Sequence, residues 1–182
     1  MFTGIVQERA RVRPLENGRL VVEARTRAEI GDSVAIDGVC LTVVENDGGL
    51  EFDVVEETLR RVKPFGGEAN VEPALRAGDP LGGHVMQGHV DGVGRVRSAG
   101  DDLTWIEPPA ELLRYCVEKG SIAVDGVSLT IAALDETGFA VALVPHTREV
   151  TTLGLLSPGD RVNLEVDVLA KYVERLLEAR VQ

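Results

Sequence analysis

One segment of the chain occurs twice, and this duplication constrains the fold more than any other feature. Residues 33–43 return as residues 121–131, so the two copies lie 88 positions apart. Seven of the eleven positions are identical, three exchange one aliphatic β-branched residue for another, and the last replaces Cys40 by Ser128. Because self-similarity at a fixed spacing marks a repeated structural unit, we infer that one small domain has been duplicated and fused.

The length of the chain fits this inference. Its 182 residues suit two small domains of about 85–90 residues each. Only two copies are visible, which indicates a tandem pair and not a solenoid, since a solenoid needs three or more repeats. Hydrophobic residues make up 44% of the chain but aromatic residues only 4%, so Val, Ile and Leu must fill the cores.

The composition also argues against several classes of partner. A net charge of −11 and a pI near 4.7 disfavour nucleic acid and anionic membranes. No apolar run approaches the roughly 20 residues of a membrane span. The chain also lacks a basic segment followed by an apolar one, so we expect no signal peptide. Cys40 and Cys116 fall in different halves without Cys-x-x-Cys spacing, so we expect a reduced, cytoplasmic protein.

Most segments are short, rich in Val, Ile and Leu, and separated by turn residues. Asp-Gly pairs at 37–38 and 125–126 predict tight hairpins, and residues 46–49 and 135–138 predict the matching next turns. Each half therefore contains about six antiparallel strands, and so few residues can remove the exposed strand edges only by closing a barrel. We predict an all-β fold with two tandem, similar, six-stranded antiparallel closed barrels, short helices and a C-terminal helix.

The expected domains are an N-terminal barrel at 1–86, a C-terminal barrel at 87–168 and an oligomerisation helix at 169–182. A short helix is predicted at 110–118, with a shorter equivalent around 26–30. Asp167 is a candidate N-cap for the last helix, in which apolar residues recur at helical spacing. Since a helix of about 13 residues is marginal alone, this apolar stripe must pack either on its own barrel or in a bundle with other copies.

The repeated strand has two different faces. Val39, Leu41 and Val43 alternate with Cys40 and Thr42, and the second copy repeats the pattern with Ser128 and Thr130 on its polar face. Because strand side chains alternate sides, one face belongs to a core and the other carries short polar groups. We interpret this polar face as a surface against which a flat ligand lies, although Ser and Thr also simply suit strands. Thr58 and Thr147 recur where a strand leads into a loop.

The glycine-rich segment 82–92 contains two of the three histidines. His84 and His89 are five residues apart, so in an extended strand they point to opposite faces, and no cysteine cluster completes a metal site. His89 shares a face with Asp91 and is a candidate proton-transfer group, with a structural hydrogen bond as the alternative. Cys116 is expected to be a buried small hydrophobe. No dinucleotide, P-loop or serine-hydrolase motif occurs.

Taken together, four segments resemble riboflavin synthase of the alpha-subunit type. They are residues 1–6 (MFTGIV), 37–42 (DGVCLT), 82–92 (GGHVMQGHVDG) and 125–130 (DGVSLT). The resemblance covers essentially the whole chain. It implies two six-stranded barrels and a C-terminal helix that assembles a homotrimer, with each active site between the N-barrel of one subunit and the C-barrel of a neighbour.

The reaction implied by the resemblance is a dismutation of two 6,7-dimethyl-8-(1-D-ribityl)lumazine molecules. A four-carbon unit passes from one to the other, which yields riboflavin and 5-amino-6-(D-ribitylamino)uracil without any cofactor or metal. Two identical substrates call for two similar binding faces, and a duplicated barrel supplies them. Association with a lumazine synthase shell is left open.

The resemblance also implies roles for particular residues. His89 is expected to transfer the proton of the acidic C7 methyl group, Cys40 or Ser128 to lie near the carbon that receives a nucleophile, and Lys119 and Asp167 to be supporting charges. Expected substrate contacts of the N-terminal segment and first barrel are Phe2, Thr3, Gly4, Ile5, Val6, Ser33, Cys40, Leu41, Thr42, Asp53, Val54, Val55, Glu56, Glu57 and Thr58. Those of the second barrel are Gly88, His89, Val90, Lys119, Ser128, Leu129, Thr130, Val144, Pro145, His146, Thr147, Arg148 and Glu149.

Two other classes of protein have the same pattern. Lumazine- or flavin-binding antenna proteins share the duplicated barrel without turnover, but they would be expected to lose motifs in the half that is no longer needed. Here both halves retain theirs, which favours the enzyme. A structural barrel without a ligand is the third alternative, and it predicts no thermal shift with lumazine.

Overall fold

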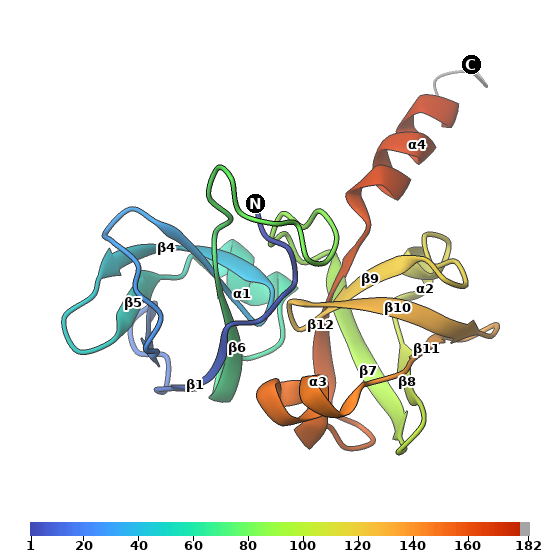
Figure 1. Cartoon of the computed structure of the whole chain (residues 1–182), viewed down its shortest axis with the longest axis horizontal. Helices are drawn as coiled ribbons and strands as arrows, with labels where there is room; N and C mark the ends of the chain where they lie inside the picture. The colour runs from blue at the N-terminus through green and yellow to red at the C-terminus, as the bar shows by residue number, and fades with distance from the viewer. Residues whose placement is uncertain (179–182) are drawn as a thin grey trace.

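The computed structural model describes residues 1–178 and contains two closed barrels of six strands each, side by side (Figure 1). The first barrel has the strand order β1-β2-β5-β4-β3-β6 around its circumference. Its strands are β1 (Glu8–Val12), β2 (Arg19–Glu23), β3 (Ser33–Ile36), β4 (Val39–Glu45), β5 (Leu50–Asp53) and β6 (Gly67–Pro73).

The second barrel repeats this topology, because its circular order β7-β8-β11-β10-β9-β12 follows from the first by matching each strand to its repeat. Its strands are β7 (Gly92–Ala99), β8 (Thr104–Glu107), β9 (Ser121–Val124), β10 (Val127–Leu134), β11 (Phe139–Val141) and β12 (Arg161–Val166). All pairings within both barrels are antiparallel. The predicted fold class is therefore confirmed.

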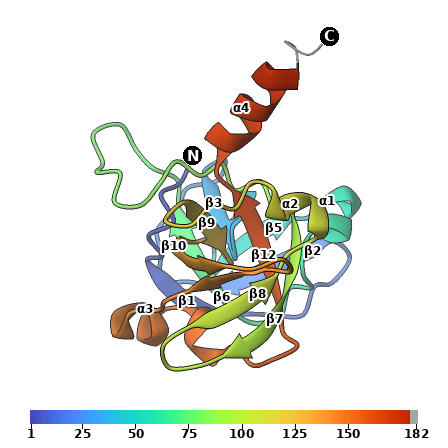
Figure 2. The ribbon, with the colours of Figure 1, turned by 90° about the vertical axis from the view of Figure 1, so that its right-hand side faces the viewer.

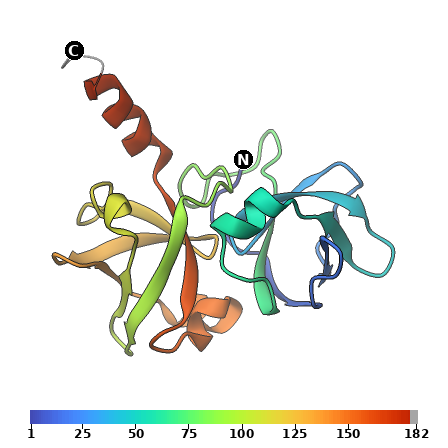
Figure 3. The same cartoon turned by 180° about the vertical axis from the view of Figure 1, so that it is seen from behind.

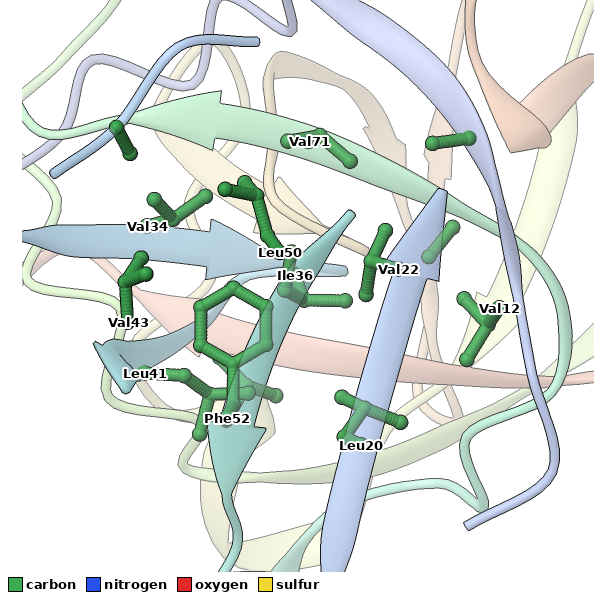
Figure 4. Packing of buried hydrophobic residues seen from close by; sticks show 14 of the residues in the cluster. Val12, Leu20, Val22, Val34, Ile36, Leu41, Val43, Leu50, Phe52 and Val71 are labelled. Atoms are coloured by element: carbon green, nitrogen blue, oxygen red, sulfur yellow. The ribbon is translucent and has the colours of Figure 1, made fainter. Parts of the chain in front are cut away.

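Each barrel encloses its own aliphatic core around one phenylalanine. Figure 4 shows Phe52 of β5 among Leu41, Val43 and Ile36 in the first barrel, and Phe139 of β11 has the equivalent place in the second. Because every second residue of these strands points inward, the small content of aromatic residues is enough to centre two cores.

The two Asp-Gly turns bring the barrels together. Asp37 and Gly38 both have positive φ, as do Asp125 and Gly126, which is the geometry of a type I′ hairpin. A Cβ atom on Gly126 would lie 2.6 Å from the backbone nitrogen of Gly38, so the two turns pack directly on each other. Glycine is therefore needed here both for the turn and for the contact between the barrels.

The short helices differ from expectation. Helices α1 (Glu56–Arg61) and α3 (Pro145–Val150) follow β5 and β11, where the sequence had indicated loops. Each is a single turn or two, below the length at which hydrophobic periodicity is readable. In the region predicted as a helix at 110–118, α2 covers only Ala110–Leu113, and residues 26–30 are not helical. A 3₁₀ turn, η1, covers Thr152–Leu155.

The last helix, α4 (Val168–Glu178), projects away from both barrels (Figures 1 and 2), and the view from behind shows the same (Figure 3). As predicted, Asp167 caps it, because the carboxylate accepts the Leu169 N–H at 2.9 Å. Leu169, Tyr172, Val173, Leu176 and Leu177 are each 55–68% exposed. Packing of this stripe on the chain's own barrel is therefore excluded. The part of the predicted helix beyond Glu178 lies outside the described residues. No helix in residues 1–178 is long and apolar enough to cross a membrane.

Candidate functional site

Two equivalent segments pass between the barrels: residues 1–6, called here the N-terminal segment, and residues 85–90, called the linker segment. Phe2 and Met86 pair through reciprocal backbone hydrogen bonds of 2.8 and 3.1 Å, and both side chains are fully buried. They form a small cluster with Ala35 of β3 and Ala123 of β9. This cluster ties the start of the chain to the junction between its halves.

Each segment contacts the repeated strand of the opposite half. The Gly4 carbonyl accepts the Ser128 N–H at 2.9 Å, and the Gly88 carbonyl accepts the Cys40 N–H at 2.8 Å. Both glycines have positive φ, and a Cβ atom on either would lie within 2.7 Å of the side chain it faces. Only glycine can lie this close. Cys40 and Ser128, the one exchange in the repeat that is not between aliphatic residues, therefore have matching glycine contacts.

The polar face of each repeated strand points outward from its barrel. In β4, Val39, Leu41 and Val43 are buried, Cys40 is half-buried and Thr42 is exposed. Ser33 of β3 lies directly opposite Thr42, and Ala35 opposite Cys40.

The second barrel repeats this arrangement. Ser121 lies opposite Thr130 and Ala123 opposite Ser128, while Thr130 is exposed and Ser128 half-buried. Each barrel thus presents three short polar side chains on one surface, whereas Ala35 and Ala123 are buried against Phe2 and Met86. Leu129 is half-buried. Leu41 and Val54 are buried in the first core, so only their backbone is available to a ligand.

His89 directly follows Gly88 and is exposed, as is Ile5 at the equivalent position after Gly4. Val6 and Val90 are both half-buried. The extended strand assumed for the histidines is wrong, because only Met86 of this segment makes a strand-like bridge. Asp91 does not bond His89 but accepts hydrogen bonds from Lys171 at 2.7 Å and from the Val166 N–H at 2.9 Å.

His84 is a residue of this region that the sequence indicated only as a rejected metal ligand. Its Nδ1 lies 2.7 Å from the Ser128 hydroxyl. Its Nε2 is buried without a hydrogen-bond partner among the described residues. Burial lowers the pKa of His84, partly offset by the charge of Asp167. The lowered pKa favours the neutral imidazole, which orients the Ser128 hydroxyl. This contact could be found only from the fold, because 44 positions separate the two residues.

The two predicted supporting charges lie near the second barrel's outer surface. Lys119 is exposed, has positive φ and donates its backbone N–H to Ile131 at 2.8 Å. Asp167 is half-buried and, with Ser121, lines a cavity of about 1070 Å³ between α4 and this barrel. The first barrel has a cavity of about 200 Å³ at the matching place, lined by Ser33, Ala74 and Arg76 among others. Each cavity therefore adjoins the polar face of its own barrel, at Ser121 in the second and at the equivalent Ser33 in the first.

The remaining predicted contacts lie at the ends of β5 and β11 and on the helices that follow. Asp53 pairs with Arg19 at 2.9 Å, and Arg148 donates to the carbonyls of Leu143, Gly100 and Asp101. These two side chains already have structural partners. Most of the others in these two segments are exposed or half-buried: Val55, Glu56, Glu57, Thr58, Val144, Pro145, His146, Thr147 and Glu149.

A buried charge cluster between the barrels was not predicted at all. Lys63 Nζ lies 2.6 Å from Asp125 Oδ2 and 3.1 Å from Asp37 Oδ2, the carboxylates of the two Asp-Gly turns. Asn70 and Asn163 cross over, each donating to the turn carbonyl of the other half. Burial raises the pKa of Asp125 to about 7 and also raises that of Asp37. The cluster fixes the orientation of one barrel on the other.

The other polar candidates fit ordinary roles. Cys116 is buried, as predicted, and burial raises the pKa of its thiol to about 11. Across residues 1–178, no group of three or more His, Cys, Asp and Glu side chains could hold a metal ion. What the site offers is therefore two matched surfaces of short polar groups. His84 lies on the second surface, against Ser128, and His89 follows Gly88, which contacts Cys40 of the first.

Comparison with known proteins agrees with this duplication. The sequence model of the lumazine binding domain matches the chain twice, at residues 3–72 and 87–167. The riboflavin synthase of Mycobacterium tuberculosis is 48% identical, over 98% of this chain and 99% of its own length. That of Actinobacillus pleuropneumoniae is 36% identical, over 97% and 90%.

Among solved structures, the crystal structure of LumP complexed with riboflavin has a TM-score of 0.82 at 23% identity, over 91% of this chain and 99% of LumP. This similarity shows the shared fold. Together with the two domain matches and the full-length relatives, it identifies the family: the chain belongs to the lumazine-binding-domain proteins and, within them, to the riboflavin synthases.

Proposed function

We propose that the chain catalyses the dismutation of two 6,7-dimethyl-8-(1-D-ribityl)lumazine molecules to riboflavin and 5-amino-6-(D-ribitylamino)uracil. The observation that carries the proposal is that both outward faces are intact: Ser33, Cys40 and Thr42 on one barrel match Ser121, Ser128 and Thr130 on the other. A protein that only binds one ligand needs one such face. A reaction between two copies of one substrate needs two.

In the proposed mechanism, one lumazine lies on each face and the rings are stacked in register. Positioning two reactants in this way removes much of the entropic barrier to their encounter. His89 takes a proton from the C7 methyl group of one ring, and the resulting carbanion attacks the other ring. Cys40 or Ser128 lies near the carbon that accepts a nucleophile, and Lys119 and Asp167 stabilise developing charge. The four-carbon unit leaves its original ring as the diaminouracil product forms.

The remaining parts of the proposal concern binding. Backbone groups along the polar faces read the pyrimidine edge, and hydroxyls such as those of Ser33 and Thr42 bind the ribityl chain. The wider contact set is the one expected from the resemblance. The N-barrel at 1–86 and the C-barrel at 87–168 each supply one face, and this division is supported by the end of β6 at Pro73 and the start of β7 at Gly92.

We propose further that the chain is a cytoplasmic homotrimer, assembled through residues 169–182. Support comes from α4, whose apolar stripe has no cover within the described chain. In the trimer, the N-barrel face of one subunit meets the C-barrel face of a neighbour, which brings the two lumazines together. Sedimentation of the purified chain tests the trimer, and sedimentation with lumazine synthase shells tests whether the two associate.

The test of function is direct. The purified chain is incubated with the lumazine, and riboflavin is followed by its absorbance. Turnover supports the enzyme, whereas stoichiometric binding without product supports the antenna alternative. If the lumazine neither binds nor shifts the unfolding temperature, the scaffold alternative is supported. Within an active enzyme, His89→Ala and Cys40→Ser should each lower turnover; near-wild-type rates in both would overturn the residue roles.

A further inference from the structure

Two buried glutamates occupy equivalent positions at the ends of β6 and β12. Glu72 is 5% exposed and Glu165 is 3% exposed. Within residues 1–178 neither forms an ion pair with a Lys, Arg or His side chain, and Lys171 beside Glu165 is engaged with Asp91. A buried carboxylate is costly unless hydrogen bonds compensate it. Because neither has an ion-pair partner in this part of the chain, hydrogen bonds must stabilise both carboxylates.

The compensation comes from the two segments that pass between the barrels. Glu72 accepts hydrogen bonds from the Thr3 N–H at 2.7 Å, the Thr3 hydroxyl at 2.8 Å and the Gly4 N–H at 3.0 Å. Glu165 accepts from the backbone N–H groups of three successive residues, Gln87 at 2.7 Å, Gly88 at 3.0 Å and His89 at 3.2 Å. Such charge-assisted bonds are about twice as strong as neutral ones, so each carboxylate orients a short backbone segment.

Each carboxylate also acts across the barrel junction. Glu165 holds Gly88, whose carbonyl accepts the Cys40 N–H, and Glu72 holds Gly4, whose carbonyl accepts the Ser128 N–H. These two series of hydrogen bonds are equivalent in the two halves of the repeat. They differ at the next residue, because the linker segment carries His89 where the N-terminal segment carries Ile5.

We infer that Glu165 and Glu72 are positioning residues for the two lumazine faces, and that Glu165 acts on the proton-transfer step by fixing the backbone of His89. Glu72 fixes the equivalent segment with Ile5 and acts on binding only. This inference rests on the proposed function. It assigns different kinetic effects to two residues that have nearly the same burial and hydrogen bonding.

The test compares Glu165→Gln with Glu72→Gln as its matched control. Glutamine keeps the shape but places an NH₂ group against N–H donors, so both segments loosen. We expect Glu165→Gln to lower kcat about 10²-fold with KM nearly unchanged, the cost of misplacing a reacting group by about 1 Å. Glu72→Gln should raise KM and leave kcat within about threefold. Equal effects of the two variants on kcat would overturn the inference.

A double-mutant comparison separates positioning from general destabilisation. In a His89→Ala background, Glu165→Gln should have little further effect on kcat, because the group it positions is gone. Undiminished loss in that background would overturn the role assigned to Glu165, as would full activity of His89→Ala alone.

Thermal unfolding of both glutamine variants checks that they are folded. If either is not, Glu165→Asp and Glu72→Asp keep the charge, shorten its reach and decide the same comparison. An inactive wild-type chain would instead reject the proposed function itself.

Discussion

The Lys63 cluster gives the sharpest stability prediction. Replacing Lys63 by Met keeps the side-chain volume but removes the only cation within 4.0 Å of Asp37 and Asp125 in residues 1–178. The Lys63 side chain is 15% exposed and the two carboxylates 4% and 0%. Removing one partner of a buried ion pair costs ~3–5 kcal/mol. Because Lys63 keeps some solvent contact, we expect the lower end, about 3 kcal/mol at pH 8.

The loss should depend on pH in a defined direction. Burial raises the pKa of Asp125 to about 7 and that of Asp37 as well. A raised carboxyl pKa contributes stability that is fully present below the unfolded value of about 3.9 and is lost as the pH rises through the folded value. Without Lys63 the folded pKa values rise further. The destabilisation by Lys63→Met should therefore be smaller at pH 5 than at pH 8, by at least about 1.4 kcal/mol, the free energy of one pKa unit.

The assay is denaturant unfolding at fixed protein concentration, at pH 5 and pH 8, with the free energy of unfolding obtained by linear extrapolation. Arg61→Met is the control, because Arg61 pairs with Glu57 on the surface, with side chains 68% and 62% exposed. That change should cost less than about 1 kcal/mol. A Lys63→Met loss as small as the control, or one that does not grow with pH, would refute the reasoning.

Three further predictions follow from the site and the last helix. Gly88→Ala places a Cβ 2.7 Å from the Cys40 Cβ at a positive φ. The free energy of unfolding should therefore fall by about 1–3 kcal/mol, and the rate of riboflavin formation should fall as well. A variant that is as stable as wild type in denaturation and as active in the riboflavin assay would contradict the close contact. Removing residues 169–182 should convert the assembly to monomers in sedimentation, and a persisting trimer rejects α4 as the assembly device. In the folded protein at pH 8, iodoacetamide should modify half-buried Cys40 before Cys116, whose pKa burial raises to about 11; mass spectrometry showing the reverse order would contradict the assigned burial.

Much of the architecture was predictable because it depends on local patterns. The repeated segment revealed the duplication, the Asp-Gly pairs specified hairpin turns, and the alternation of Val39 and Leu41 with Cys40 specified which face is buried. Helices α1 and α3 were not predictable in the same way, because a six-residue helix is too short to show a period. The short polar residues of the repeated strand likewise indicated the candidate face of the first barrel, because strand side chains alternate between two sides.

What the sequence by itself determined was the duplication, the closed barrels and the two polar faces, since hydrophobic alternation and turn chemistry act over a few neighbouring residues. Only the tertiary structure decided which distant groups meet: His84 with Ser128, Glu165 with the linker segment, and Lys63 with both Asp-Gly turns. The physical reason is that a buried charge must find its partners wherever the fold places them. The separation of two residues along the chain therefore does not predict whether they meet in the fold.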